Sequence, residues 1–147
     1  MMRIKQLLAL IAVSSFLVMS SCEDEISKIS SGDEPIKEIA GKWHVVQLSR
    51  NGEELSERMD MTNFSIEFKP DGTYSVAEQL PFMLQGSGNY RLNDPQYPFS
   101  LLMSAQDDGQ ELAVSMQYPV VKGERQLSLS FSLGCSGNTY QYNFERE

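Results

Sequence analysis

The chain has 147 residues and a formal net charge of −8, with 12 Lys and Arg residues against 20 Asp and Glu residues. This acidic balance disfavours nucleic acid and anionic membrane surfaces as direct partners, because clustered basic side chains bind both of them. One histidine and two cysteines are too few ligands for the common tetrahedral zinc sites. We therefore expect no metal, no cofactor and no nucleic-acid partner.

The first 21 residues have the three parts of a secretory signal peptide. Two of the first five residues are basic, Leu7–Met19 is an apolar run of 13 residues interrupted only by two serines, and Ser20 and Ser21 are small residues before Cys22. The run is shorter than the roughly 20 residues that a membrane-spanning helix needs. We expect residues 1–21 to be a signal peptide that is cleaved off.

The segment Met19-Ser20-Ser21-Cys22 resembles the lipobox of bacterial lipoproteins, although Met19 stands where leucine is usual. The resemblance implies that the sulfur of Cys22 is acylated, with palmitate among its acyl chains, and that the lipid anchors the protein in a membrane. Ordinary cleavage before an unmodified Cys22 is the alternative. The acidic run Glu23–Glu25 resembles the export signal of Bacteroidetes lipoproteins. It implies an outer-membrane protein exposed at the cell surface, with a periplasm-facing orientation as the alternative.

Residues 23–38 are polar and charged and are interrupted by Gly32 and Pro35, which is typical of a tether. A segment of this length reaches roughly 50 Å when extended. Without Arg3 and Lys5, ten basic residues remain against 20 acidic ones in the exported chain. We expect a lipidated tether over residues 22–38 and one domain over residues 39–147.

From Gly41 onward, apolar and polar residues alternate, which places one face of each strand in a core. The clearest example is Gln126–Leu133, in which three leucines and Phe131 face one way and serines face the other. Lys69–Gly72 is typical of a tight hairpin turn. Gly52–Met61 lacks alternation and is expected to hold a short helix or a lid. The pattern predicts strands near residues 42–49, 63–69, 72–77, 86–92, 99–105, 111–118, 126–133 and 138–145.

Eight antiparallel strands joined by short links predict an all-β domain with an up-and-down barrel, which has no exposed sheet edges because it closes on itself. A β-sandwich of two sheets is the alternative. The interior of an eight-stranded barrel is either filled by side chains or holds one small ligand.

The opening Gly41-Lys42-Trp43 resembles the Gly-x-Trp start of lipocalin-type barrels. In those barrels the tryptophan plugs one end, and a basic residue of the last strand packs over it. The resemblance implies a lipocalin-like barrel in which Trp43 and Arg146 form a structural plug through a cation–π contact.

A second resemblance covers nearly all of residues 39–147. The chain resembles a family of uncharacterised lipocalin-like lipoproteins from Bacteroides and its relatives. The family has no assigned activity, so the resemblance implies fold, lipidation and lineage, and it carries over no functional residue. The phrases that carry it are Arg50-Asn51-Gly52, Pro70-Asp71-Gly72-Thr73-Tyr74, Leu80-Pro81-Phe82, Asp94-Pro95-Gln96-Tyr97-Pro98, Gly123-x-Arg125-Gln126-Leu127 and Gly134-Cys135-Ser136-x-Asn138-Thr139-Tyr140.

An inward-facing set of aromatic and methionine side chains is the candidate ligand pocket. Ligand sites are usually apolar with a few polar groups that orient the ligand, and tyrosine hydroxyls supply such groups. Ordinary core packing explains the same residues. The candidate residues are Tyr74, Tyr90, Met116, Phe131, Tyr140 and Tyr142. Separately, Tyr97, Phe82 and Phe99 near the proline-rich bends form a candidate rim for stacking on sugars or on a partner.

Nucleophilic catalysis has one candidate pair, Cys135 with His44, if the first and last hairpins meet in space. The glycine-rich connection around Cys135 is explained equally well as a strand turn, and no other catalytic motif is present. We therefore expect a protein that is not an enzyme.

Two functions are compatible with the sequence. The first is an outer-membrane lipoprotein whose barrel binds a small apolar molecule or a glycan. The second is a non-catalytic accessory subunit that docks on another outer-membrane protein. An internal cavity of at least about 300 Å³ favours the first function, whereas a filled barrel with an exposed apolar patch favours the second.

Overall fold

The computed structural model describes residues 34–78, 86–106, 109–132, 134 and 137–147. The predicted signal peptide and Cys22 lie outside these residues. The part of the chain that the structure describes contains no helix long and apolar enough to cross a membrane. Its long strands are β1 (Gly41–Arg50), β3 (Ser65–Phe68), β4 (Thr73–Ala77), β5 (Ser87–Leu92), β6 (Ser100–Ala105), β7 (Glu111–Gln117), β10 (Leu127–Ser132) and β11 (Thr139–Arg146).

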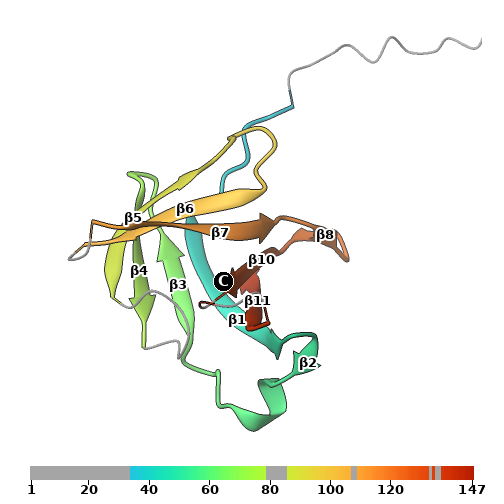
Figure 1. Cartoon of the computed structure of the whole chain (residues 1–147). Coiled ribbons are helices and arrows are strands. Elements are labelled where there is room, and N and C mark those ends of the chain that lie inside the picture. Colours follow the sequence, from blue (N-terminus) through green and yellow to red (C-terminus); the bar gives the residue numbers. More distant parts are fainter. Residues whose placement is uncertain (1–33, 79–85, 107–108, 133, 135–136) are drawn as a thin grey trace, which may run out of the picture. The chain divides into compact units, whose positions relative to one another are not determined.

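These eight strands form a closed antiparallel barrel (Figure 1). Neighbours along the chain pair in the order β1, β3, β4, β5, β6, β7, β10 and β11, and β11 pairs again with β1. The closing pair runs from Trp43 opposite Arg146 to Arg50 opposite Tyr140. The prediction of an all-β, eight-stranded up-and-down barrel is confirmed, and the alternative of a two-sheet sandwich is wrong.

Four short elements lie outside this meander. The segment Gly52–Met61 contains β2 (Glu53–Glu54), which pairs with the end of β1, and η1 (Ser56–Arg58), one turn of 3₁₀ helix. Strands β8 (Val120–Val121) and β9 (Glu124–Arg125) pair only with each other among the described strands. The alternation pattern predicts none of these strands, because two exposed residues leave no periodic signal.

A β-bulge in β1 changes which side chains face the core. The pairing with β11 shifts between Val45 and Gln47, so the inward positions are Val45 and then Leu48 rather than Val45 and Gln47. Val46, at the bulge, is 38% exposed. An extra residue in one strand of a pair reverses the alternation beyond it. The bulge therefore turns Leu48 inward, where it is fully buried.

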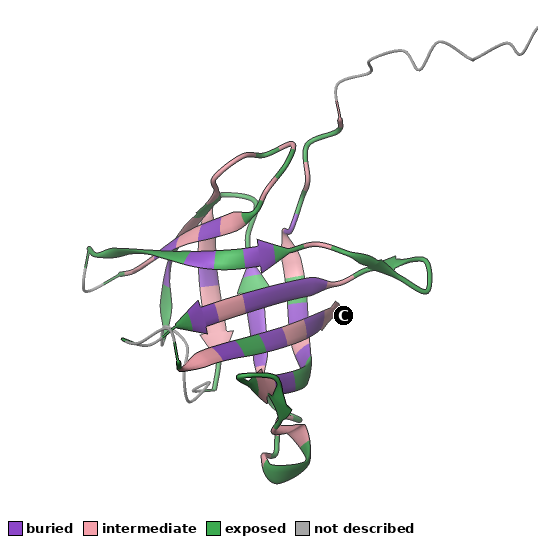
Figure 2. Ribbon diagram, turned by 45° about the vertical axis from the view of Figure 1, so that its right-hand side comes forward, coloured by how far each residue is buried: buried purple, intermediate pink, exposed green. Residues whose placement is uncertain are grey.

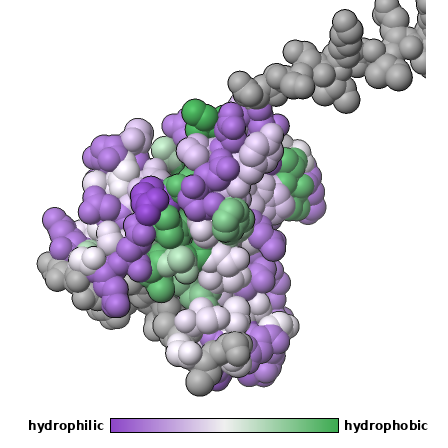
Figure 3. All heavy atoms as spheres, turned by 45° about the horizontal axis from the view of Figure 1, so that its top comes forward, coloured by the Kyte–Doolittle hydropathy of each residue, from purple (hydrophilic) through white to green (hydrophobic). Residues whose placement is uncertain are grey.

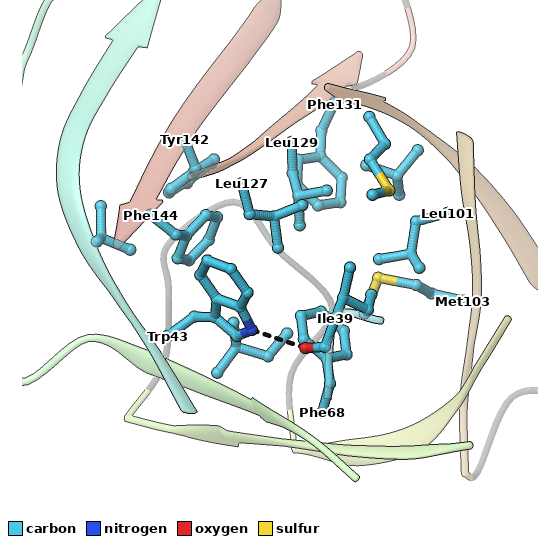
Figure 4. Close-up of a cluster of buried hydrophobic side chains, with 14 of the residues drawn as sticks. Ile39, Trp43, Phe68, Leu101, Met103, Leu127, Leu129, Phe131, Tyr142 and Phe144 are labelled. Atoms are coloured by element: carbon cyan, nitrogen blue, oxygen red, sulfur yellow. Dashed lines mark hydrogen bonds between the residues drawn. The ribbon is translucent and has the colours of Figure 1, made fainter. Parts of the chain in front are cut away.

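Buried residues lie along strands around the barrel (Figure 2), and their side chains form one core inside it (Figure 4). Along β11 the inward residues Tyr140, Tyr142 and Phe144 are buried, and Gln141 between them is exposed. The full buried apolar set is Ile39, Trp43, Val45, Leu48, Ile66, Phe68, Tyr74, Leu101, Met103, Val114, Met116, Leu127, Leu129, Phe131, Tyr140, Tyr142 and Phe144. Ile39 precedes the first strand, so the N-terminal segment is part of this core.

Gly88 marks a place where two strands and an inward ring crowd together. A Cβ at this position would lie 1.9 Å from the carbonyl oxygen of Ser104 and 2.9 Å from Cε1 of Tyr74. Only glycine leaves enough room here, because any side chain would collide with backbone that cannot move independently. Gly88 thus allows the ring of Tyr74 to lie inside the barrel.

Candidate functional site

The six predicted pocket residues all belong to barrel strands, and five of them are buried in the core. Tyr74 lies on β4, Met116 on β7 and Phe131 on β10, while Tyr140 and Tyr142 lie on β11. Tyr90, on β5, is half-buried. Its ring packs edge-on against Phe68 at 4.8 Å, and its hydroxyl donates to the carbonyl of Lys69 at 2.8 Å. The hydroxyl of Tyr90 is therefore already engaged.

Protein atoms, rather than a hollow, surround most of the predicted pocket. A ligand-sized cavity leaves accessible surface on the side chains that line it, yet the predicted residues Tyr142, Tyr74 and Met116 are only 0%, 1% and 3% exposed. The ring of Phe131 stands edge-on to Tyr142 at 6.0 Å, and Phe144 stacks on the other side at 6.2 Å. Figure 4 shows these side chains converging from different strands. Contacts of this density are typical of a close-packed interior.

Two buried hydroxyls nevertheless lack a hydrogen-bond partner among the described residues. They belong to Tyr74, which is 1% exposed, and to Tyr142. Burial raises the pKa of both side chains, and the neighbouring Tyr140 raises the pKa of Tyr142 further. Both phenols are therefore neutral at physiological pH, and each keeps an unused O–H donor. A buried donor without an acceptor is unfavourable, so these two atoms are the polar groups that a ligand or a water molecule could satisfy.

The structure brings Trp43 and Arg146 together at one end of the barrel, which we call the plug end. The guanidinium carbon of Arg146 lies 4.8 Å from the centroid of the Trp43 ring. The indole nitrogen of Trp43 donates to the carbonyl of Ile39 at 2.8 Å (Figure 4), and Nη2 of Arg146 donates to the carbonyl of Glu38 at 3.1 Å. The N-terminal segment is thereby fastened across the end of the barrel.

Tyr118 and Arg125 extend this arrangement. Tyr118 packs edge-on to Trp43 at 6.1 Å, and its hydroxyl donates to the backbone carbonyl of Glu38. The guanidinium carbon of Arg125 lies 5.3 Å from the centroid of the Tyr118 ring. A surface hollow of about 390 Å³ opens beside these groups. Because Glu38, Glu124, Glu145 and Glu147 also line it, the two arginines do not make it attractive to an anion. We interpret this end as a structural plug.

His44 lies in a second surface hollow of about 470 Å³, together with Met59 and Met61 of the segment after β2. Its Nδ1 atom is buried and has no hydrogen-bond partner among the described residues. Cys135, its predicted catalytic partner, lies outside those residues. No group of three or more His, Cys, Asp or Glu side chains that could hold a metal occurs in the part of the chain with described coordinates.

Loop 93–99, between β5 and β6, presents two members of the predicted rim. Tyr97 is 64% exposed and Phe99 is 69% exposed, while Phe82 lies outside the described residues. The loop sits at the plug end, because the amide of Lys37 in the N-terminal segment donates to the carbonyl of Pro95 at 2.7 Å. Figure 3, with this end turned toward the viewer, shows hydrophobic side chains between hydrophilic ones.

The ribbon made of β8 and β9 projects from the barrel wall in Figures 1 and 2. Val120 is 55% exposed and Val121 is 36% exposed on it. At its base, Nη1 of Arg125 donates to the carbonyl of Tyr118 at 3.0 Å. Lys122 and Gly123, which join the two strands, both have positive φ. The sequence pattern gave no sign that the preceding valines stay outside the core.

Replacing Arg146 with methionine should lower the free energy of unfolding by about 1 kcal/mol, because the cation–π contact with Trp43 and the donation to Glu38 are lost. Urea denaturation followed by circular dichroism measures this change. Arg91→Met is the matched control. Among the described residues, the side chain of Arg91 forms an exposed ion pair with Glu111, so its loss should lower the free energy of unfolding by roughly 0.5 kcal/mol or less. Equal effects of the two substitutions would rule out a special role for the plug.

The buried Tyr142 predicts a loss of stability at high pH. Its folded pKa is raised, so between the usual tyrosine pKa of about 10 and the folded value only the unfolded chain releases this proton. The stabilisation is therefore complete below pH 10 and declines as the pH rises above it. In Tyr142→Phe the decline should be shallower by up to about 1.4 kcal/mol per pH unit. Urea midpoints measured between pH 8 and about 11.5 test this, and identical slopes would contradict the burial of the hydroxyl.

Comparison with known proteins identifies a family whose function is unknown. No curated protein and no solved structure matches this chain. Residues 20–145 match the family described as a domain of unknown function, DUF5004. Since the match covers most of the chain, including almost the whole barrel, this chain belongs to the DUF5004 family.

Proposed function

We propose that this chain is a lipoprotein of the outer membrane, held at the cell surface by a lipid on Cys22, whose barrel is a docking domain for another outer-membrane protein. It is a lipocalin-like member of the lipoproteins of Bacteroides and its relatives, and it is not an enzyme. The anchor rests on the apolar run, the small residues before Cys22 and the acidic run after it. The family match begins at residue 20, next to this cysteine.

The filled interior is the observation that carries the docking function. In the described part of the barrel, Trp43, Tyr142 and Phe144 have no accessible surface, although a bound small molecule would need a cavity beside such residues. Opening a ligand-sized space would leave large apolar side chains without contacts, which is strongly unfavourable in a close-packed core. A barrel of this kind acts through its outer surface.

The β8–β9 ribbon is the surface we assign to the partner. It exposes two adjacent valines on a segment that projects from the wall, and neither strand pairs with any other described strand. Unpaired strand edges bind extended segments of other proteins through backbone hydrogen bonds, and exposed apolar side chains add buried area. The bond from Arg125 to the carbonyl of Tyr118 holds the base of the ribbon, so little order has to be gained on docking.

A second function is favoured by the two unpartnered hydroxyls. A small apolar molecule or glycan with hydrogen-bond acceptors would satisfy Tyr74 and Tyr142 if it entered the barrel. Native mass spectrometry of the purified protein separates the two functions. A retained ligand that Tyr142→Phe weakens supports binding inside the barrel, whereas the bare protein mass supports the packed docking domain.

Once the signal peptide has been cleaved, the lipid on Cys22 is the proposed anchor of the protein. Cys22→Ala removes the site of this lipid, so the cleaved variant should move from the membrane fraction to the soluble fraction. Fractionation of cells and labelling with radioactive palmitate measure both consequences. Ser20→Ala is the matched control, since it keeps a small residue before the cleavage site. Membrane retention of unlabelled Cys22→Ala protein from which residues 1–21 have been cleaved would refute the lipid anchor.

A photo-reactive amino acid at Val121 should cross-link the protein, in intact cells, to one discrete outer-membrane protein. The same amino acid at Glu67, an exposed residue of β3 on the barrel wall, is the control and should give no such product. Val120→Asp combined with the probe at Val121 should reduce the product, because a charge replaces buried apolar contact. Products of equal yield from both sites, or from neither, would contradict docking through the ribbon.

A further inference from the structure

The three most exposed large hydrophobic side chains among the described residues occur at the plug end. Ile36 is 71% exposed, Phe99 is 69% exposed and Tyr97 is 64% exposed. They come from two segments far apart in sequence, which are joined by the hydrogen bond from the amide of Lys37 to the carbonyl of Pro95. We call these three residues the apolar edge. Exposed apolar side chains that share one region of a surface are candidates for a binding role.

Hydrogen bonds hold the loop that carries the two aromatic rings. Oδ1 of Asn93 accepts from the amides of Phe99 and Ser100 at 3.0 and 2.8 Å. Oδ1 of Asp94 accepts from the amides of Gln96 and Tyr97 at 2.8 and 3.1 Å. The rings are therefore presented on an ordered backbone, and binding requires little further ordering.

The charges of these two segments are compatible with a neutral lipid surface. The ammonium of Lys37 pairs with Glu34, and this hydrogen bond lowers the pKa of the Glu34 carboxyl. The carboxylate of Asp94 is engaged by the loop amides, whereas Glu38, whose backbone carbonyl accepts from Arg146, is an exposed residue. No cluster of basic side chains is present on either segment, so anionic headgroups would not be attracted.

The N-terminal segment that leads toward Cys22 joins the barrel at the plug end and not at the opposite end. Described structure starts at Glu34, and only residues 23–33 separate it from Cys22. Extended, that stretch spans about 40 Å at most. With a lipid on Cys22, the segment 34–40 and the adjoining loop stay within that distance of the membrane. Tethering turns a weak surface contact into an intramolecular one with a high effective concentration.

We propose that the apolar edge is a membrane-contact surface, which rests on the lipid anchor proposed above. Ile36 and Phe99 enter the boundary between headgroups and acyl chains. Tyr97 lies at headgroup level, where its ring is buried and its hydroxyl stays hydrated, as is usual for interfacial tyrosines. The contact orients the barrel with its plug end toward the lipid.

Tryptophan fluorescence tests the contact in the full lipidated protein. The variant Phe99→Trp is reconstituted in phosphatidylcholine vesicles whose acyl chains carry bromine, a short-range quencher. The native Trp43 is 0% exposed inside the barrel and provides a constant background. Relative to vesicles without bromine, emission from the introduced indole should fall by about half and shift to shorter wavelength, as expected for an indole at the interface.

Leu112→Trp is the matched control, because Leu112 is 38% exposed at the opposite end of the β6–β7 pair. Its emission should not change with bromine. Adding Ile36→Ser and Tyr97→Ser to Phe99→Trp should remove most of the quenching if the three residues act together. Unquenched Phe99→Trp, or equal quenching at both sites, would overturn the membrane contact.

Flotation of the vesicles separates this inference from the anchor. Protein that floats while Phe99→Trp stays unquenched keeps the anchor and overturns the contact. If protein that retains Cys22 does not float, both proposals are overturned. Cys22→Ala is the reference for protein that does not float. Unquenched protein whose emission responds instead to added oligosaccharides would assign the apolar edge to glycan stacking.

Discussion

The pairing of β1 with β11 is the constraint on which the rest of the structure depends. It joins the first and last strands over seven residue pairs, from Trp43 opposite Arg146 to Arg50 opposite Tyr140. Without this pairing the meander would be an open sheet with two long unpaired edges. The same pairing places the C-terminal arginine over Trp43, so that closure of the barrel and formation of the plug are one event.

A closed barrel of eight strands has an interior that side chains of ordinary size can fill. Here seven of the buried side chains are aromatic. Several of them, among them Trp43 and Phe144, have no solvent-accessible surface. Not every buried polar group is hydrogen-bonded, since the hydroxyls of Tyr74 and Tyr142 have no partner among the described residues. In so small a barrel, an interior that is closely packed by side chains leaves no room for a large ligand cavity. Our proposals therefore rest on features of the outer surface.

The surface features with functional potential lie close to one another along the fold. The apolar edge, the base of the β8–β9 ribbon and residues 34–40 all adjoin the plug end. A contact of this end with lipid would place the ribbon near the membrane surface, where an outer-membrane partner presents its exposed parts. The two proposals are therefore compatible in space, although they depend on different residues.

The sequence by itself determined the eight strands of the barrel and the inward face of most of them, because alternation of apolar and polar residues is a local property that one strand displays alone. It also singled out Trp43 with Arg146, and the exposed Tyr97 and Phe99. Tertiary structure decided what depends on distant neighbours. The bulge after Val45 turns Leu48 rather than Gln47 inward, and Val120 and Val121 remain outside although their composition suits a core. Whether a cavity remains among the inward side chains also depends on how rings from several strands interlock, and no single segment carries that information.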